Sequence, residues 1–328
     1  MMSSPRCLLL WLASLFLFAP ALVSSADDDK VLASLPSPAC NVSHEIVFSA
    51  SPQKSRSGIH VATIGCGDKA AYEIPGLLWS LAKQPQRKEI SLHLILDASI
   101  YDHLIHCLHL LKTVFRSIDV YRTNHVVNLP CGIDLACFHC SGCKLFLYDI
   151  LSEQVKHVLY VDADTLVLGD LAELWQVWSS KALEQKIFLA AKESGTSYST
   201  RVKNIYGPTG INSGVLLMNL GMMRQLGVTV KTLMDVNPIP LEWPDQDLLN
   251  NWCHLKYHTC GFLACKWNIR IDYHVDAVEE CRDHARNMRD GILHGNRRAF
   301  HSGSTEPKQF EMHDENRRKF EKFCKMQT

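Results

Sequence analysis

The sequence predicts an α/β fold built on a mainly parallel sheet with crossover helices. Short apolar runs, typical of buried strands, alternate along the chain with longer segments of helical periodicity. Polar residues directly follow several of these runs, and ligands in open α/β sheets bind beyond the carboxyl ends of the strands. The 328 residues, 47% of them hydrophobic, suffice for one large domain or two small ones, and we expect one.

Each expected element rests on its apolar pattern. The strand candidates are short runs such as 158–161, which is β-branched and aromatic as a buried strand should be. They cover residues 59–64, 90–96, 118–121, 158–161, 187–191 and 215–220. The helix candidates repeat apolar residues every three or four positions, as Ile74, Leu77, Leu78 and Leu81 do. They cover residues 70–83, 99–115, 144–152, 171–178, 248–252 and 308–323, while 194–206 is polar and predicted to be a loop.

Residues 1–26 are interpreted as a targeting segment. Arg6 is the only charge before Asp27, residues 7–23 are nearly all apolar, and small residues at 23–26 suit cleavage. The apolar run is long for a signal peptide and short for a membrane span, so a cleaved signal and an uncleaved type II anchor both stay open. With either, the rest of the chain enters the lumen of the endoplasmic reticulum or Golgi.

The segment that follows supports this compartment. Residues 27–57 are rich in Ser, Pro and Ala and predict a stem or linker, so we place the folded domain at 58–328. Asn41 begins an Asn-Val-Ser glycosylation acceptor. The chain has 13 cysteines, and setting aside Cys7 leaves an even number suited to disulfides. The net charge of zero and the absence of a basic run give no indication of a nucleic-acid partner.

Four closely spaced cysteines allow two interpretations. Cys131, Cys137, Cys140 and Cys143 contain a Cys-x-x-Cys-x-x-Cys core that would suggest a metal in a cytosolic protein. In the secretory lumen we favour disulfides. The alternative, a zinc-dependent hydrolase that uses this cluster and nearby His139, would require reduced thiols and an open ligand position.

Two carboxylates directly follow the strand candidate at 158–161. Asp162 and Asp164 stand one residue apart, and burying both without a partner would be very costly. A divalent cation removes that cost, because hard cations take oxygen ligands. The alternative is that Asp162 caps a turn and Asp164 is solvated.

Three further polar groups are expected at strand ends or loop starts, where they would converge on one crevice. These groups are Asn212-Ser213-Gly214, Asp245-Gln246-Asp247 and His294-Gly295-Asn296-Arg297. The last group combines a neutral metal ligand, a close-approach glycine and a cation, which are the parts needed to hold a metal-bound diphosphate. Each group also has a structural interpretation: a turn for the first, a helix cap for the second and a core histidine for the third.

The four motifs, in this order, resemble the retaining UDP-sugar glycosyltransferase family that includes glycogenin and bacterial galactosyltransferases. The stretches 66–68, 265–268 and 292–297 are most similar to its glucoside xylosyltransferase branch. That branch adds xylose to O-linked glucose on epidermal-growth-factor-like repeats. The resemblance covers residues 58–301 and implies a Rossmann-like nucleotide-binding sheet of the GT-A type.

The resemblance also implies roles for individual residues. Asp162, Asp164 and His294 would ligate Mn²⁺, which bridges the diphosphate of the UDP-sugar. Asp245, Gln246 and Asp247 are the implied catalytic residues, and Asp245 and Gln246 would face the reacting carbon and the sugar hydroxyls. The residues implied to bind the donor are Cys66, Gly67, Asp68, Lys144, Asp162, Ala163, Asp164, Asn212, Ser213, Gly295, Asn296 and Arg297. Pro244 departs from the branch, which tends to have Gly before its Asp-Gln-Asp motif.

The function expected from this resemblance is Mn²⁺-dependent transfer of xylose from UDP-xylose to a glycoprotein, by front-face attack with retention. UDP-glucose or UDP-galactose is the alternative donor, because either differs from UDP-xylose by one CH₂OH group and one side chain can decide such a difference. A catalytically silent, lectin-like or scaffold protein of the secretory pathway is the alternative of another class. No nucleophile elbow supports serine hydrolysis.

Overall fold

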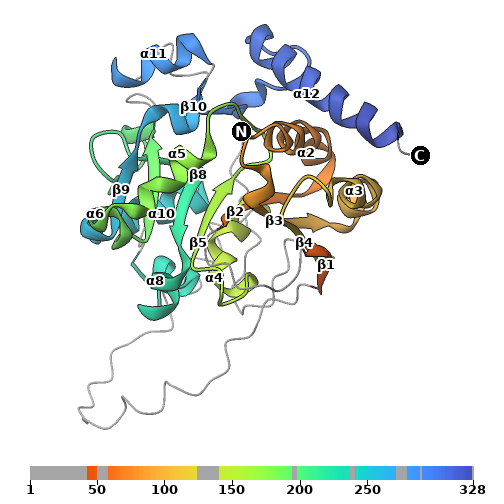
Figure 1. Ribbon diagram of the computed structural model, residues 1–328. Coiled ribbons are helices and arrows are strands. Elements are labelled where there is room, and N and C mark those ends of the chain that lie inside the picture. Colours follow the sequence, from red (N-terminus) through yellow and green to blue (C-terminus); the bar gives the residue numbers. More distant parts are fainter. Residues whose placement is uncertain are drawn as a thin grey trace, which may run out of the picture.

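An eight-stranded sheet forms the centre of the computed structural model (Figure 1), which describes residues 43–49, 58–123, 140–193, 198–236, 241, 243–270, 279–288 and 290–326. The strand order is β1-β4-β3-β2-β5-β8-β7-β9. The strands are β1 Ser43–Ser49, β4 Ser117–Thr123, β3 Ile90–Asp97, β2 Ile59–Gly65, β5 His157–Val161, β8 Ile211–Asn219, β7 Phe188–Lys192 and β9 Cys260–Leu263. Four of the seven neighbouring pairs in this sheet are parallel, which confirms the expected mainly parallel α/β fold.

The sheet is covered on both faces because its strands are apolar on both faces. Val61 of β2 lies opposite Leu159 of β5, and both pack into one hydrophobic core. Their neighbours Ala62 and Tyr160 also lie opposite each other and pack into the core on the other face. Successive side chains of a strand point to opposite faces, so a continuous apolar run is what a two-sided core requires.

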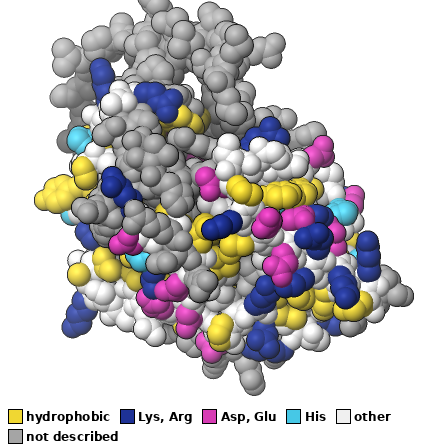
Figure 2. Space-filling view, turned by 90° about the horizontal axis from the view of Figure 1, so that it is seen from above, with side chains coloured by type: hydrophobic (Ala, Val, Ile, Leu, Met, Phe, Trp, Pro, Cys, Tyr) yellow, Lys and Arg dark blue, Asp and Glu magenta, His cyan; other side chains and the backbone are white. Residues whose placement is uncertain are grey.

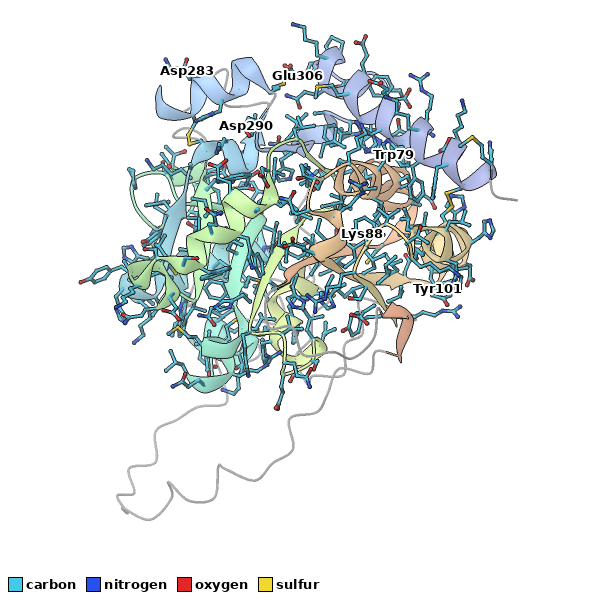
Figure 3. All side chains as sticks on the ribbon, in the orientation of Figure 1. Trp79, Lys88, Tyr101, Asp283, Asp290 and Glu306 are labelled. Carbon is cyan, nitrogen blue, oxygen red and sulfur yellow. A yellow bond between two sulfur atoms is a disulfide. The ribbon has the colours of Figure 1, made fainter. Side chains whose placement is uncertain are left out.

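Three long helices lie together beside the N-terminal half of the sheet (Figure 1). They are α2 Gly67–Ala82, α3 Ala98–Leu111 and the C-terminal α12 Pro307–Lys325. The helices α2 and α12 pack closely, since a Cβ on Gly76 would lie 2.6 Å from Nε2 of His313. The ring of Trp79 on α2 lies 5.7 Å from that of Phe323 on α12 (Figure 3). A disulfide between Cys107 and Cys324 joins α3 to α12.

A second, three-stranded sheet brings together residues that are far apart in the sequence. Its order is β10-β11-β6, with β10 Ile269–Arg270, β11 Ile292–His294 and β6 Thr165–Val167. The antiparallel register of β11 and β6 sets His294 opposite Thr165, directly after Asp164. This small sheet therefore delivers the histidine to the aspartate pair.

The remaining helices are short and connect the strands. They are α4 Leu147–Ile150, α5 Leu171–Trp175, α6 Lys181–Glu184, α8 Leu220–Gln225, α9 Val230–Asp235, α10 Pro244–Leu255 and α11 Glu279–Asn287. The 3₁₀ turns are η2 Arg87–Glu89, η4 Cys140–Phe146, η5 Gln176–Ser179, η6 Tyr257–Thr259, η7 Cys265–Asn268 and η9 Asn296–Arg298. On the face seen in Figure 2, acidic and basic side chains are intermixed over the described residues.

Three predictions need correction. The stem at 27–57 contains β1, which pairs with β4, so the sheet begins before the predicted domain start at residue 58. Residues 144–152 form a 3₁₀ turn and one helical turn, where a continuous helix was expected. Asn212, Ser213 and Gly214 lie inside β8, although the sequence placed them before the strand. Asn212 and Ser213 can lie within a strand because buried partners from outside β8 satisfy their side chains.

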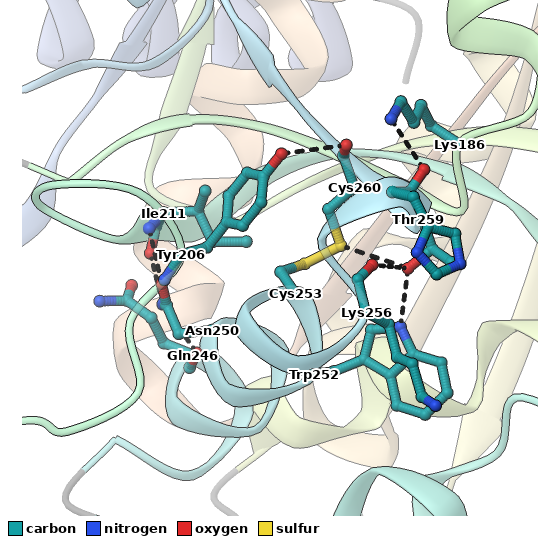
Figure 4. Close-up of a disulfide and its surroundings, with 11 residues drawn as sticks. Lys186, Tyr206, Ile211, Gln246, Asn250, Trp252, Cys253, Lys256, Thr259 and Cys260 are labelled. Atoms are coloured by element: carbon teal, nitrogen blue, oxygen red, sulfur yellow. Dashed lines mark hydrogen bonds between the residues drawn. A yellow bond between two sulfur atoms is a disulfide. The ribbon is translucent and has the colours of Figure 1, made fainter.

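The structure confirms the expected disulfides among the cysteines that it describes. Besides Cys107–Cys324, the structure contains Cys253–Cys260 (Figure 4) and Cys265–Cys281, and Cys66 is also disulfide-bonded. Of the predicted cysteine cluster, Cys143 is buried, and burial raises the pKa of its thiol to about 12. Cys131 and Cys137 lie outside the described residues, and so do the predicted targeting segment and Asn41. Among the helices that the structure describes, none is long and apolar enough to span a bilayer.

The Cys107–Cys324 disulfide is expected to stabilise the fold more than Cys253–Cys260 does. The first joins residues 217 positions apart and the second residues 7 apart. In the chain-entropy treatment, the long loop corresponds to roughly 5 kcal/mol and the short one to roughly 2 kcal/mol. Urea denaturation of the Cys107→Ala/Cys324→Ala and Cys253→Ala/Cys260→Ala variants measures both losses. A larger loss from the second pair would contradict this ranking.

Candidate functional site

Two aspartates and a histidine meet where the large and small sheets join. Asp162 directly follows β5, Asp164 directly precedes β6, and His294 is the last residue of β11. One potential ligand atom from each lies within 4.8 Å of the others. Backbone bonds fix the arrangement: Asp162 donates its N–H to the carbonyl of Gly214 at 2.8 Å, and Gly295 donates to the carbonyl of Asp164 at 2.6 Å. The sequence-predicted metal residues are thus brought together.

Close packing holds the imidazole of His294 in this position. Nε2 lies 3.4 Å from Oδ1 of Asp164 and 3.8 Å from Oδ2 of Asp162. A Cβ on Gly214 would lie 2.1 Å from Cε1 of His294, so only glycine fits beneath the ring. Nδ1 lies 2.9 Å from Oδ1 of the buried Asn268, which orients the other ring nitrogen toward the carboxylates.

Lys144 joins two of the predicted motifs through a buried ammonium group. Its Nζ lies 3.1 Å from Oδ1 of Asp162, 2.9 Å from Oδ2 of Asp245 and 3.0 Å from the carbonyl of Ser213. Burial alone lowers the pKa of Lys144, but the two carboxylates outweigh it and raise the pKa overall. Tyr160 completes the group, because its hydroxyl donates to Oδ1 of Asp162 at 2.6 Å. All three ammonium protons have acceptors within the protein, so Lys144 positions the two aspartates.

On the opposite side, Asp164 faces helix α2. Burial raises the pKa of Asp164, but His294 and Lys69 outweigh it and hold that pKa below the ordinary value. The Nζ of Lys69 lies 3.9 Å from Asp164 and 3.5 Å from Glu73. Burial and the charge of Asp164 raise the pKa of Glu73 to about 8, although Lys69 opposes the shift. Oε1 of Glu73 lies 2.8 Å from Nε2 of His301.

A buried amide network extends from the histidine into the larger sheet. The side chain of Asn212 donates to Gln246 at 2.9 Å and to Glu193 at 3.0 Å. Gln246 in turn donates to Glu193 at 2.9 Å. Glu193 forms an ion pair with Arg270, and both side chains are about 5% exposed. Two predicted residues, Asn212 and Gln246, therefore depend on an ion pair that the sequence motifs do not include.

The two aspartates of the Asp-Gln-Asp motif have separate partners. Ser213 donates its hydroxyl to Asp245 at 2.8 Å. Asp247 accepts from the hydroxyl of Tyr198 at 2.7 Å and from the backbone N–H of Trp243 at 2.9 Å. Asp245 caps no helix, so the helix-cap interpretation is wrong for this residue. Pro244 is the first residue of α10, a position where proline is well tolerated.

Asn250 ties this helix to the strand that carries Asn212. Its amide donates to the carbonyl of Ile211 at 2.9 Å, and its carbonyl accepts from the N–H of Ile211 at 2.8 Å (Figure 4). The same amide donates to the backbone carbonyl of Gln246 at 3.0 Å. Asn250 is fully buried, so the helix start and the strand start are held together by a satisfied polar group.

We call Asp162, Asp164 and His294 the triad. The remaining predicted donor-binding residues lie near the start of α2 or beside this triad. Gly67, with φ of +69°, donates its N–H to Asp97 at 2.6 Å in the turn after β2, where Cys66 is disulfide-bonded. Ala163 is buried between the two aspartates. Asn296 and Arg297 lie in η9, and the side chain of Arg297 is outside the described residues.

Asp68 lines a cavity of about 660 Å³ beside Lys69. The walls of this cavity come from the start of α2, from η9 and the turn that follows it, and from helix α12. Its lining residues are Asp68, Lys69, Tyr72, Arg298, His301, Ser302, Phe310, Asp314 and Arg317.

Sequence reasoning missed Glu193, Arg270, Lys69 and Glu73. Glu193 directly follows β7 and Arg270 ends β10, so each stands at a strand end, the signal that identified Asp162. Neither belongs to a motif, and a single charged residue after a strand is common. Lys69 follows Asp68 in the first turn of α2 and could have been included with the turn around it.

Comparisons with known proteins agree with this geometry. Residues 134–294 match the family model described as Glycosyl transferase family 8. This chain carries a family 8 glycosyltransferase domain. Glucoside xylosyltransferase 1 of Mus musculus is 33% identical over 179 residues, which cover 49% of this chain and 44% of the relative. Glucoside xylosyltransferase 2 of Xenopus laevis is 28% identical over 275 residues, covering 76% of this chain and 63% of the relative.

Solved structures share the fold of this family 8 chain. The galactosyltransferase LgtC, in complex with donor and acceptor sugar analogs, superposes with a TM-score of 0.54 at 17% identity, covering 78% of this chain and 96% of that one. Mouse xyloside xylosyltransferase 1 gives a TM-score of 0.52 at 16% identity, covering 74% and 98%. These likenesses establish the GT-A fold. The chain spans 40–44% of the length of the mammalian and fish glucoside xylosyltransferase 1 sequences it matches.

Replacing the buried Lys144 is expected to destabilise the family 8 domain strongly. Lys144→Met would leave Asp162 and Asp245 near each other without their shared cation. Removing one partner of a buried ion pair typically costs about 3–5 kcal/mol. The free energy of unfolding from urea titration measures this, with Lys231→Met, which removes an exposed pair with Asp235, as control. Equal effects of the two substitutions would show that Lys144 is not essential to the fold.

Proposed function

We propose that this protein is a retaining glycosyltransferase that moves xylose from UDP-xylose to O-linked glucose on a glycoprotein, with Mn²⁺ as cofactor. The observation that carries the proposal is the convergence of Asp162, Asp164 and His294 beside the buried Lys144. The identity to glucoside xylosyltransferase 1 supports the choice of donor and of an O-linked glucose acceptor. Epidermal-growth-factor-like repeats are the proposed carrier of that glucose.

The three converging side chains fit a divalent cation such as Mn²⁺. Two carboxylates and one imidazole present their ligand atoms within 4.8 Å of one another, and carboxylate oxygens suit hard cations. His294 aims Nε2 toward both aspartates, as a metal ligand must. When bound, the cation would neutralise negative charge that develops on the departing diphosphate. Three protein ligands leave further coordination positions for phosphate oxygens.

The hydrogen bonds of the site support front-face attack. In retaining glycosidases, a carboxylate near the anomeric carbon acts as nucleophile. Here Asp245 is paired with Lys144 and Ser213, Asp247 accepts from two donors, and Glu193 is paired with Arg270. Such partners stabilise each carboxylate and reduce its tendency to attack carbon. The leaving diphosphate would then accept the acceptor's proton, with Asp245 and Gln246 positioning the donor sugar.

The proposed compartment is the lumen of the endoplasmic reticulum or Golgi. The disulfides of the described residues require an oxidising environment, which the secretory pathway provides. A signal peptide or a type II anchor at residues 1–26 would bring the chain there. The alternative of a silent, lectin-like protein has less support, because all three proposed ligands are present at one point.

Removing one proposed ligand should abolish metal-dependent nucleotide binding. In Asp164→Asn the site loses a carboxylate ligand. Because the loss of even an outer partner of a metal ligand typically costs 10–100-fold in affinity, we expect Mn²⁺-dependent UDP binding to weaken by about 100-fold. Isothermal titration of UDP with and without Mn²⁺ measures the change. Asp290→Asn, which changes an exposed aspartate paired with Lys266, serves as control and should bind normally. Unchanged UDP binding by Asp164→Asn would remove the metal site from the proposal.

Donor choice is tested by assaying UDP release from a panel of UDP-sugars with Mn²⁺, in the presence of a glucosylated peptide acceptor. We expect turnover of UDP-xylose and at least tenfold slower turnover of UDP-glucose and UDP-galactose, since one CH₂OH group can change binding by this factor. Preference for UDP-glucose or UDP-galactose would leave the proposed mechanism unchanged but would reject UDP-xylose as the donor. No turnover of any donor, together with no Mn²⁺-dependent UDP binding, would favour the silent protein.

A further inference from the structure

We propose that Glu193 sets the tautomer of His294 through a directed chain of two buried asparagines. The chain runs from Glu193 to Asn212, from Asn212 to Asn268, and from Asn268 to Nδ1 of His294. It places a proton on Nδ1, so Nε2 faces Asp162 and Asp164 and is the nitrogen left without a proton when the ring is neutral. Its functional meaning rests on the proposed metal site, but the tautomer itself can be tested without metal.

The direction of the chain begins with Asn212, which lies between a group that only accepts and a group that only donates. The carboxylate of Glu193, held by Arg270, can only accept, so the NH₂ of Asn212 must face it, at 3.0 Å. The backbone N–H of Gly214 can only donate, so the carbonyl of Asn212 must face it, at 3.0 Å. Both constraints require the same orientation of the amide.

Gln246 provides an independent check of this orientation. Its NH₂ donates to the same oxygen of Glu193 at 2.9 Å, and its carbonyl accepts from the backbone N–H of Ser213 at 3.2 Å. The carbonyl of Gln246 also accepts from the NH₂ of Asn212 at 2.9 Å. Turning either amide over would set donor against donor at one end and acceptor against acceptor at the other. The two side chains therefore lock each other through Glu193.

The next step transmits this direction to the histidine. The carbonyl of Asn212 also accepts from the NH₂ of Asn268 at 2.8 Å. This leaves the carbonyl of Asn268 pointing at Nδ1 of His294, 2.9 Å away. A carbonyl cannot donate, so Nδ1 must carry the proton for this contact to be a hydrogen bond. In a neutral ring the other nitrogen, Nε2, is then the acceptor.

Burial makes the chain rigid. Asn268 is fully buried, and Glu193, Arg270 and His294 are each about 5% exposed. Water therefore has little access to satisfy a reversed amide, and every buried polar group must find its partner within the protein. Arg270 of β10 is also the strand partner of His294 in the small sheet, so the ion pair and the imidazole are fixed to the same backbone. Glu193 and Asn268 act as positioning residues for the metal ligand.

The tautomer can be read directly by ¹⁵N NMR of the metal-free protein labelled at its histidine ring nitrogens. His294→Asn identifies the signals of this ring among the 16 histidines. The spectra are recorded at a pH high enough for the ring to be neutral, where we expect wild-type His294 to carry its single proton on Nδ1. In Asn268→Leu the ring loses its acceptor, and in Glu193→Gln the new NH₂ is expected to face the donors of Asn212 and Gln246, because Arg270 attracts the carbonyl. Both variants should show a mixture of the two tautomers.

The same variants are then titrated with Mn²⁺ and followed by electron paramagnetic resonance. Affinity should fall 10–100-fold in both, which is typical when an outer partner of a metal-bound histidine is lost. Asn251→Leu is the matched control, because Asn251 is also buried and donates to a backbone carbonyl, that of Val236, away from the chain. It should leave both the tautomer and the affinity unchanged.

Three results would overturn the proposal, and each is distinct from failure of the proposed function. A neutral wild-type ring with its proton on Nε2 would contradict the direction of the chain. A Glu193→Gln protein with the wild-type tautomer and affinity would limit the effect to Asn268. An equal loss of affinity in Asn251→Leu would indicate general destabilisation. By contrast, a wild-type protein with the expected tautomer but no Mn²⁺ binding would confirm the chain and reject the metal site.

Discussion

The site depends on how the protein compensates a high local density of buried negative charge. Strands of both sheets and helix α10 bring together four carboxylates, those of Asp162, Asp164, Asp245 and Glu193. Burial without partners would be very costly for each of them. The compensating ion pairs are specific: Lys144 pairs with both Asp162 and Asp245, and Arg270 pairs with Glu193. For Asp164 the neighbours are His294 and Lys69, at longer distances, which is consistent with a position that a cation could strengthen.

This pattern separates two kinds of carboxylate. Asp245 and Glu193 each have a close cation and further hydrogen-bond donors, so their oxygens are committed to holding the site in shape. Asp162 has one oxygen bound to Lys144 and Tyr160, while its other oxygen faces His294 at 3.8 Å. The oxygens with the weakest protein partners are those that face the common point of the triad. This distribution of partners is what a cation site between the three side chains would require.

The sheet and the pair Asp162 and Asp164 could be predicted because both depend on local patterns, whereas the resemblance to a known family added His294 to the pair. The apolar run from Val158 to Val161 predicts a buried strand. Acidic residues directly after a buried strand indicate a functional site, because burying them without a partner is costly. The position of Asn212 inside β8 could not be predicted, since it depends on Glu193, Gln246 and Asn268, which come from distant parts of the chain. The same holds for β1, whose place in the sheet is set by pairing with β4. Polar residues in a strand are stable only when tertiary structure supplies their partners.

The two ends of the domain meet at the cavity beside the triad. Helix α2 contributes Lys69 and Tyr72 from its first two turns, while α12 contributes Arg317, whose guanidinium lies 4.8 Å from the centre of the Tyr72 ring. Lys69 connects this cavity to Asp164. Because the Cys107–Cys324 disulfide anchors α12 to α3, it also fixes one wall of the cavity. Opening this disulfide would remove a covalent anchor of the helix that supplies one wall of the cavity, so its contribution extends from stability to the shape of that cavity.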